Sequence, residues 1–236
     1  MRTLAILTSI ALIFLASCND VPKSVSGSNQ TETATEKNNT VIETLKKDEA
    51  IAAPFVLDEE NAIDFFFKYA DTLRQDKVRL TTSMGSFTVQ LYNNVPYHRA
   101  NFIYLSRKGY FNDTQFHRVV KGFIIQGGSS DDRETSKKRR EIGRYLLPPD
   151  SKKGYKHHRG TLSMPSSERD NPHKLASPYE FFIVVTKPGS YHLDGNYTPF
   201  GKVIEGMDVV DAINNVKVGD GDWPYQNVWI EKVEVF

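Results

Sequence analysis

Residues 116–128 constrain the fold of this chain more than any other stretch. They read FHRVVKGFIIQGG, a β-type apolar run that carries three polar side chains: His117, Arg118 and Gln126. Its glycines permit tight turns or the close approach of another backbone. Taken alone, the run fits a buried strand whose arginine points to water and whose Gly-Gly pair closes a hairpin. It also places the permanent positive charge of Arg118, the phenyl ring of Phe123 and the amide of Gln126 within nine consecutive residues.

The composition is that of an ordinary soluble globular protein. The chain has 236 residues, of which 39% are hydrophobic and 25% charged, and its formal net charge is +1. A net charge near zero gives no reason to expect a nucleic-acid partner. The single cysteine, Cys18, excludes an intramolecular disulfide, so the fold must depend on core packing.

Residues 1–18 have the pattern of a targeting segment. Arg2 precedes an apolar stretch at residues 4–15, which is too short for a transmembrane helix of about 20 residues. The sequence Leu-Ala-Ser-Cys that ends at Cys18 resembles the bacterial lipobox, which implies cleavage before the cysteine, its lipidation and a place in the bacterial cell envelope. Several acyl chains would anchor the protein stably to a membrane. The alternative is an ordinary secretory signal with an incidental cysteine.

Two further segments precede the main domain. Residues 19–53 are polar and contain too few large apolar side chains to offset their ordering entropy, so we expect a disordered tether. Residues 54–76 predict a helical extension, with Asp58 as a candidate N-cap. One apolar face follows at helical spacing, and its members are Ala62, Phe65, Phe66, Tyr69 and Leu73. We expect this helix to pack on the domain, although contact with a partner or a membrane surface is the alternative.

The remaining segments are strands, helices and one long polar stretch. A β-hairpin is predicted on either side of residues 83–86, a helix over residues 96–109, a short helix from Met207 and a closing strand over residues 228–236. Residues 129–159 are polar and carry two basic clusters, which could bind nucleic acid or anionic lipid but which we interpret as a solvated loop. The adjacent His157 and His158 lack the spacing of a metal site, so no metal is expected.

The run at residues 116–128 resembles the signature of the cyclophilin family, Phe-His-Arg-Val/Ile-x-x-Gly-Phe-x-x-Gln-Gly-Gly. Residues 160–164 (GTLSM), 180–185 (EFFIVV) and 193–207 resemble further segments of that family, in the same order. The resemblance covers residues 77–236. It implies a mainly β fold, a closed antiparallel barrel of about eight strands capped by two helices, to which residues 54–76 add an extra N-terminal helix.

The resemblance also implies an activity, the cis-trans isomerisation of X-Pro peptide bonds. Resonance gives this rotation a barrier of roughly 18–20 kcal/mol. No covalent bond is broken, so no cofactor or metal is needed. The family's role for the arginine, stabilising the twisted amide, falls on Arg118. Phe123 matches the floor of the proline pocket, Gln126 the amide that holds the substrate backbone, and His117 a supporting residue beside the arginine.

The resemblance assigns further residues to substrate binding: Met164, Pro165, Ser166, Glu180, Phe182, His192, Leu193 and Tyr197. Taken singly, Met164 and Phe182 also fit ordinary core positions.

Several of these positions depart from the family pattern. Pro165 and Ser166 stand where many members have Ala-Asn, which weakens a contact with the substrate backbone because proline lacks an N–H. Glu180 replaces a glutamine and would disfavour acidic substrates or pair with a basic neighbour. His192 replaces a tryptophan that influences cyclosporin binding, and Tyr197 replaces a histidine while keeping an aromatic wall.

The expected partners are extended or unfolded proline-containing polypeptides, together with a membrane reached through the lipid anchor, and the protein is expected to be a monomer. Two alternatives remain open. The domain could bind proline segments without catalysis, as a chaperone or scaffold, which the changes at Ser166 and Glu180 motivate. It could also be a structural lipoprotein whose basic loop docks a partner.

Overall fold

The computed structural model describes residues 55–166 and 170–236. The signal peptide, the lipidation site at Cys18 and the tether, all three predicted from the sequence, lie outside the described residues. Within the described ranges, no helix is both long enough and apolar enough to cross a membrane.

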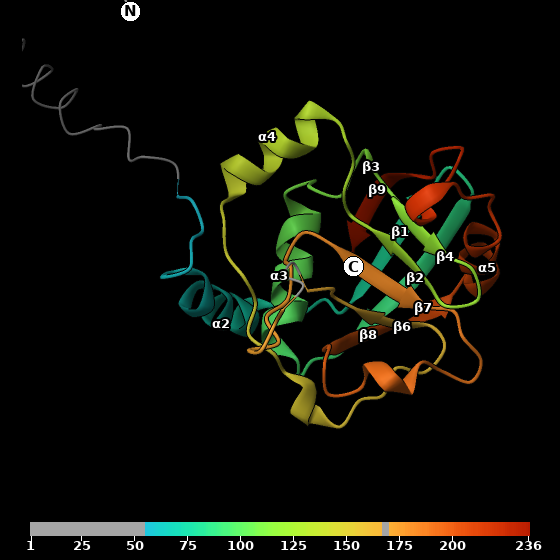
Figure 1. Cartoon of the computed structure of the whole chain (residues 1–236). Coiled ribbons are helices and arrows are strands. Elements are labelled where there is room, and N and C mark those ends of the chain that lie inside the picture. The colour runs from blue at the N-terminus through green and yellow to red at the C-terminus, as the bar shows by residue number, and fades with distance from the viewer. Residues whose placement is uncertain (1–54, 167–169) are drawn as a thin grey trace, which may run out of the picture. The chain divides into compact units, whose positions relative to one another are not determined.

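The described strands form one antiparallel sheet with the order β3-β9-β1-β2-β8-β6-β7-β5-β4. Figure 1 shows how the sheet curls. The strands are β1 (Lys77–Thr82), β2 (Gly85–Leu91), β3 (Thr114–Gln115), β4 (Arg118–Val120), β5 (Ile124–Gly127), β6 (Thr161–Ser163), β7 (Phe181–Val184), β8 (Pro199–Glu205) and β9 (Trp229–Val235).

The expected closed barrel of about eight strands is not confirmed, because the described part of the chain has nine strands in an order with two ends, β3 and β4. One run of chain carries both ends. Its first part, β3, pairs with β9, and its second part, β4, pairs with β5. Gln115 also bridges to Ser129, the second residue after β5. The motif at residues 116–128 therefore joins the two edges of the sheet.

The hairpin predicted around residues 83–86 is present. β1 and β2 pair from Lys77–Gln90 to Thr82–Gly85, and Val78 and Leu80 face the core in alternation with exposed residues. The other predicted strands, at residues 160–164, 180–185 and 228–236, appear as β6, β7 and β9.

The α-helices are α2 (Ala62–Thr72), α3 (Pro96–Arg107), α4 (Arg133–Ile142) and α5 (Met207–Asn214). Helices α3 and α5 match the sequence prediction. Pro96 stands in the first turn of α3, where its missing N–H costs no intrahelical hydrogen bond, and Ala100 and Ile103 are buried. Helix α3 contacts β8 and β9, whereas α5 contacts β2, β4 and β5. Figure 1 shows these two helices at opposite ends of the curled sheet.

Helix α2 packs on the domain, as expected. The Asp58 carboxylate accepts hydrogen bonds from the backbone N–H groups of Glu60 and Asn61, and the helix begins at Ala62. Its apolar face meets α3 (Figure 1), where Phe66 and Tyr104 lie edge to face with ring centroids 5.8 Å apart. Phe66 is fully buried. The helix is thus an integral part of the hydrophobic core.

The chain enters the described fold through a backbone clamp. Leu57 N donates to Ile142 O at 2.8 Å, and Arg144 N donates to Leu57 O at 2.9 Å. Gly143, between these partners, has a φ of +133°, and a Cβ there would overlap the Leu57 carbonyl. Glycine is therefore required where the end of α4 meets the start of the fold.

The interpretation of residues 129–159 as a solvated loop was wrong, because this stretch contains helix α4. The Asp132 carboxylate caps the helix by accepting from the backbone N–H of Glu134 at 2.9 Å. Lys138 then donates to the carbonyls of Gly109 and Asn112, at 3.2 and 2.7 Å. The ammonium group of Lys138 could have remained in water, but it attaches the helix to the domain instead.

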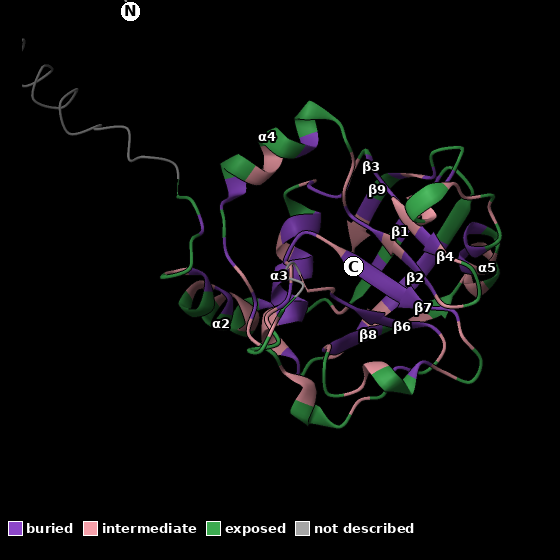
Figure 2. Ribbon diagram, viewed as in Figure 1, coloured by how far each residue is buried: buried purple, intermediate pink, exposed green. Residues whose placement is uncertain are grey.

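The buried apolar side chains form a main core and a smaller cluster. The main core lies between the sheet and helices α2, α3 and α5. The smaller cluster consists of Ile124, Phe182 and Val184, with Val120, Phe123, Leu193 and Tyr197 packed against it. Figure 2 shows β6 and β7 as buried and the outer turns of α4 as largely exposed.

Replacement of Phe66 by alanine tests whether α2 belongs to the cooperative unit. We expect Phe66→Ala to lower the free energy of unfolding by about 3–5 kcal/mol, because the substitution leaves a cavity between α2 and α3. Urea denaturation measures the loss. The matched control is Phe67→Ala on the same helix, where the side chain is 56% exposed and the expected change is within about 0.5 kcal/mol. Equal effects of the two substitutions would contradict this role for α2.

Candidate active site

Strand register brings together the polar residues of the motif and an aromatic ring. Arg118 on β4 is directly opposite Gln126 on β5, and Gln126 is opposite Phe182 on β7. Opposed residues of an antiparallel pair point to the same face of the sheet. The intervening Val119 and Ile125 belong to the main core, so Arg118, Gln126 and Phe182 form a row on the other face. We call this row with its neighbours Val120, Ile124 and Val184 the site face.

The apolar half of the site face coincides with the smaller hydrophobic cluster. The Phe123 ring stacks on His192 with centroids 5.4 Å apart, and the Phe182 ring meets Tyr197 edge to face at 5.7 Å. Leu193 packs against the same cluster. Residues that are far apart in the sequence thus surround one apolar surface, which can seat a small ring.

The guanidinium of Arg118 borders this surface. The Arg118 side chain is 41% exposed, and its Nη2 lies 3.2 Å from Oδ2 of Asp222. Asp222 ends the short 3-10 helix η3 (Asp220–Asp222) and has a φ of +64°. The sequence analysis missed Asp222, since nothing in its surroundings marks it as a neighbour of the motif.

A polar cluster adjoins Gln126. The Gln126 amide donates from Nε2 to Oε2 of Glu180 at 2.9 Å, and Nε2 of His117 lies 3.5 Å from the same oxygen. On the other side, Nη2 of Arg139 lies 3.7 Å from Oε1 of Glu180. Burial raises the pKa of the Glu180 carboxyl, but hydrogen bonds from His117 and Gln126 and the Arg139 charge outweigh it. The pKa therefore lies below its usual value, and the carboxylate is ionised at neutral pH.

The turn between β4 and β5 is held by Asn214, at the end of α5. The Asn214 side chain accepts from the backbone N–H of Gly122 at 2.7 Å and donates to the carbonyls of Val120 and Ile124 at 2.9 and 3.2 Å. Gly122 has a φ of +71°, which favours glycine. Asn214 thus satisfies three backbone groups of the turn, and the sequence offered no signal for this role.

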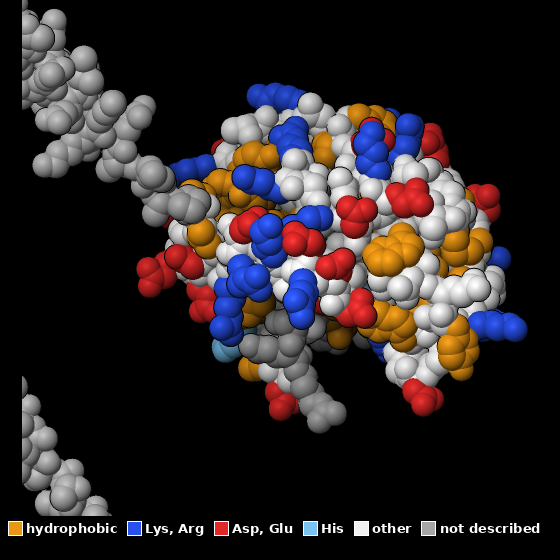
Figure 3. Space-filling model, turned by 90° about the horizontal axis from the view of Figure 1, so that it is seen from above, with side chains coloured by type: hydrophobic (Ala, Val, Ile, Leu, Met, Phe, Trp, Pro, Cys, Tyr) orange, Lys and Arg blue, Asp and Glu red, His pale blue; other side chains and the backbone are white. Residues whose placement is uncertain are grey.

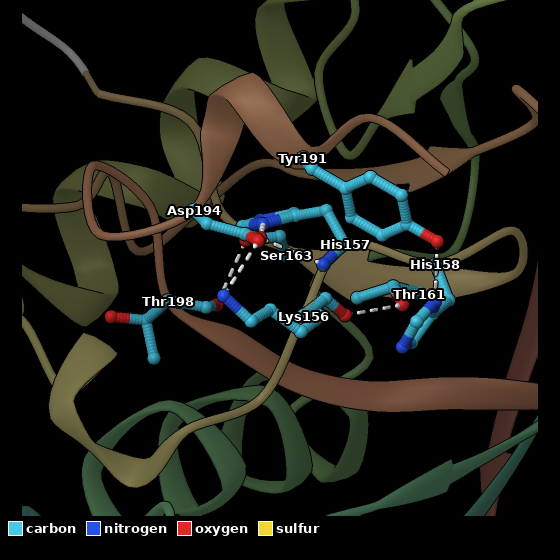
Figure 4. Close-up of polar contacts among 8 residues, drawn as sticks. All are labelled: Lys156, His157, His158, Thr161, Ser163, Tyr191, Asp194 and Thr198. Carbon is cyan, nitrogen blue, oxygen red and sulfur yellow. Dashed lines mark hydrogen bonds and ion pairs between the residues drawn. The ribbon is translucent and has the colours of Figure 1, made fainter. Parts of the chain in front are cut away.

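The far wall of the site face is fixed by a buried histidine. Leu193 ends the 3-10 helix η2 (Tyr191–Leu193), and the next residue, Asp194, accepts from His157 Nδ1 at 2.8 Å and from its backbone N–H at 2.9 Å. Figure 4 shows this cluster, in which His157 also contacts Ser163 at 3.2 Å. The His157 ring is stacked beneath Phe182, with centroids 6.1 Å apart.

Charge at this histidine is governed by its burial. Burial lowers the pKa of His157, although the hydrogen bond and charge of Asp194 act in the opposite direction. Burial raises the pKa of Asp194, but hydrogen bonds from the His157 ring and backbone bring it below its usual value. The pair therefore holds the segment behind Leu193 as a neutral ring and a carboxylate at neutral pH.

For three further residues, Met164, Pro165 and Ser166, the role in substrate binding stays a prediction. Met164 is almost fully buried and belongs to the main core, not to the cluster at the site face. The Pro165 carbonyl accepts from Ser177 N at 2.8 Å, and the Ser166 hydroxyl accepts from Asn171 at 2.8 Å. The site face also includes Ile124, which was not predicted. Its position two residues before Gln126 on the same strand could have indicated this.

No group of three or more His, Cys, Asp or Glu side chains in residues 55–166 and 170–236 could hold a metal ion. The site face offers a guanidinium, an anchored amide and an apolar surface.

Comparison with known proteins identifies the family. The family model "Cyclophilin type peptidyl-prolyl cis-trans isomerase/CLD" matches residues 77–235. The chain is 36% identical over 160 residues to peptidyl-prolyl cis-trans isomerase CYP18-1 of Arabidopsis thaliana, covering 67% of this chain and 94% of the relative. It is 32% identical over 169 residues to peptidyl-prolyl cis-trans isomerase B of Escherichia coli K12, covering 67% and 98%.

Other matches differ in extent. A Rhizopus delemar peptidyl-prolyl cis-trans isomerase-like 2 is 35% identical over 172 residues, and the chain spans only 31% of that longer relative. The solved structure of a Cryptosporidium parvum cyclophilin-type isomerase has 28% identity and a TM-score of 0.58, covering 69% of this chain and 98% of that one. A second structure of that protein was obtained in the presence of the dipeptide Ala-Pro, with a TM-score of 0.57. The chain belongs to the cyclophilin-type peptidyl-prolyl cis-trans isomerases.

Proposed function

We propose that the site face is the catalytic surface of this isomerase and that Arg118 stabilises the twisted X-Pro amide. When the amide rotates, its nitrogen loses conjugation and regains a lone pair, which a fixed cationic donor stabilises. A guanidinium is suited to this role because it stays protonated and presents several donors in a rigid plane. The row of Arg118, Gln126 and Phe182 across three paired strands is the observation that carries the proposal.

The apolar half of the site face serves as the seat for the proline ring. Phe123, Ile124 and Phe182 supply its floor, and Leu193 and Tyr197 supply its wall. A proline held there has its amide nitrogen beside Arg118. The Gln126 amide binds the substrate backbone, and His117 supports the site without transferring a proton, since the reaction moves none.

Asp222 orients the guanidinium of Arg118 without occupying it fully. The ion pair with Asp222 involves one terminal nitrogen of Arg118, Nη2. A guanidinium has five N–H donors, so this pair does not use all of them. Because both side chains are more than one third exposed, the pair adds little to stability. Its contribution is to restrict the directions in which the Arg118 side chain can point.

The substrates we propose are extended or unfolded polypeptides that contain proline. The Cryptosporidium parvum structure obtained with Ala-Pro supports a proline dipeptide as the minimal element recognised. On the face seen in Figure 3, Lys and Arg side chains are interspersed with Asp and Glu side chains. This mixture of signs favours recognition of local proline geometry over recognition of a strongly charged partner.

We further propose that the protein acts as a monomer anchored to the bacterial cell envelope by a lipid on Cys18. The sole cysteine of the chain stands at the end of a Leu-Ala-Ser-Cys sequence that follows a short apolar stretch. Its clients would then be envelope polypeptides that fold near the membrane.

A non-catalytic binding module is the second candidate. The observation that favours it is the ion pair with Asp222, which occupies part of the guanidinium needed for catalysis. Wild-type protein that binds a proline peptide without accelerating its isomerisation, and that still binds it after Arg118→Ala, would support this candidate.

Replacement of Arg118 by alanine tests the catalytic proposal. We expect the rate of isomerisation, as kcat/KM on a peptide with one X-Pro bond, to fall by on the order of 10²–10³-fold, the usual cost of losing one preorganised donor. Exchange NMR of the peptide measures the rate. Lys121→Ala, in the turn of the same hairpin, is the matched control and should keep wild-type activity. A wild-type protein with no activity above background would refute the proposal.

Replacement of Cys18 by serine tests the anchor. We expect Cys18→Ser to remove the protein from the membrane fraction, because the acyl chains that hold it there can no longer be attached. Cell fractionation with incorporation of labelled palmitate measures this, and Ser17→Ala serves as the control. Unchanged membrane association and label in Cys18→Ser would exclude the lipid anchor.

A further inference from the structure

We propose that Arg139, on helix α4, is a positioning residue for the isomerase site, which it reaches through Glu180 and the Gln126 amide. This inference rests on the proposed function, in which Gln126 binds the substrate backbone. Helix α4, which was not predicted from the sequence, then takes part in substrate recognition.

The two oxygens of Glu180 face different partners. Oε2 faces the Gln126 amide at 2.9 Å and His117 at 3.5 Å, whereas Oε1 faces Arg139 at 3.7 Å. An ionised carboxylate only accepts hydrogen bonds, so the NH₂ end of the Gln126 amide must be the end turned toward it. The carbonyl end of the amide is then available to accept a hydrogen bond from a substrate N–H. A neutral amide in place of Glu180 could accept or donate, and would leave both orientations open.

Arg139 is itself held firmly. Its Nε donates to the Tyr110 hydroxyl at 2.8 Å, and its Nη2 donates to the Ser129 hydroxyl at 3.0 Å. Its guanidinium lies over the rings of Tyr110 and Tyr179, 5.9 and 5.4 Å from their centroids. A guanidinium with this many contacts is a fixed charge, and its place on α4 sets where the Glu180 carboxylate rests.

The charge of Arg139 also contributes to lowering the pKa of Glu180, after the larger contributions of His117 and Gln126. The groups that face this carboxylate are His117 from the start of the motif, Gln126 from β5, Arg139 from α4 and the nearby Tyr110 hydroxyl. Burial, more than any other cause, raises the pKa of Tyr110 to about 12, so that hydroxyl is neutral across the working range. Loss of Arg139 removes one of the influences that lower the Glu180 pKa, and the pKa then rises.

The test compares Arg139→Met in two backgrounds. In the otherwise wild-type protein we expect Arg139→Met to lower kcat/KM for a peptide with one X-Pro bond by on the order of tenfold, mainly through KM, because the Gln126 amide is no longer fixed. In a Glu180→Gln background, with no carboxylate left to hold, the same substitution should cause no further loss. Arg139→Lys keeps the charge and should retain most of the activity.

The pH profile gives a second readout. The competent form has Glu180 ionised, so a raised Glu180 pKa makes kcat/KM fall at a higher pH on acidification. On acidification we therefore expect kcat/KM of Arg139→Met to fall at a higher pH than kcat/KM of the wild type, so the variant is the less active protein on the acidic side. In the Glu180→Gln background, profiles with and without Arg139 should coincide.

Arg140→Met, one position further along α4, is the matched control and should behave as the wild type. An equal loss from Arg139→Met in both backgrounds would mean that Arg139 only stabilises the fold, and would overturn the inference. Thermal melting identifies a variant that fails to fold. In that case the comparison passes to Arg139→Lys, which should lose a minor part of its activity in the wild-type background and none in the Glu180→Gln background.

The side-chain amide signals of Gln126 in ¹⁵N-labelled protein separate this inference from the proposed function. They should shift or broaden in Arg139→Met and remain unchanged in Arg140→Met, whether or not the protein catalyses isomerisation. Identical Gln126 signals in the wild type and Arg139→Met would overturn the inference, whereas an inactive wild type with shifted signals would overturn only the proposed function.

Discussion

Hydrogen bonds between Asn214 and the turn that joins β4 to β5 hold the register on which the site depends. In that register Arg118 and Gln126 share one face of the sheet, and Val119 and Ile125 fill the core on the other. Because side chains alternate along a strand, a slip of one residue would bury the guanidinium and the amide and expose two core side chains. The apolar core and the polar site are thus fixed by the same pairing.

Ionic groups at the site are each matched by a partner, which suits a reaction that makes and breaks no covalent bond. Arg118 meets Asp222, and Glu180 meets both a neutral amide and a second arginine. Charges held in this way need little rearrangement when the amide twists, and preorganisation of this kind is where electrostatic catalysis gains its strength. The buried His157 and Asp194 apply the same principle to the wall of the proposed proline seat.

The sequence predicted most of what depends on local pattern and on the family motif. The alternating β1–β2 hairpin, helix α3 and the paired strands of the motif all have short-range signals. Helix α4 was missed because its stretch has no apolar face. Its Asp132 cap was the one local sign of it. Asp222 and Asn214 reach the site from segments about 90 to 100 residues away, and no single-sequence pattern reports such a contact. Met164 was assigned to the pocket from the motif alone, and its side chain is buried in the main core.

The clamp at Leu57 has a mechanical consequence. Tension applied to the chain upstream of Phe55 would first load the two backbone hydrogen bonds that tie Leu57 to residues 142 and 144, before it reached α2 or the first strand of the sheet. Those bonds lie at the C-terminal end of α4, the helix that carries Arg139. A pull on the N-terminal side would therefore strain the support of Glu180 and Gln126 sooner than it strained the sheet. The side chains proposed to bind peptide would feel the force before the core that surrounds them.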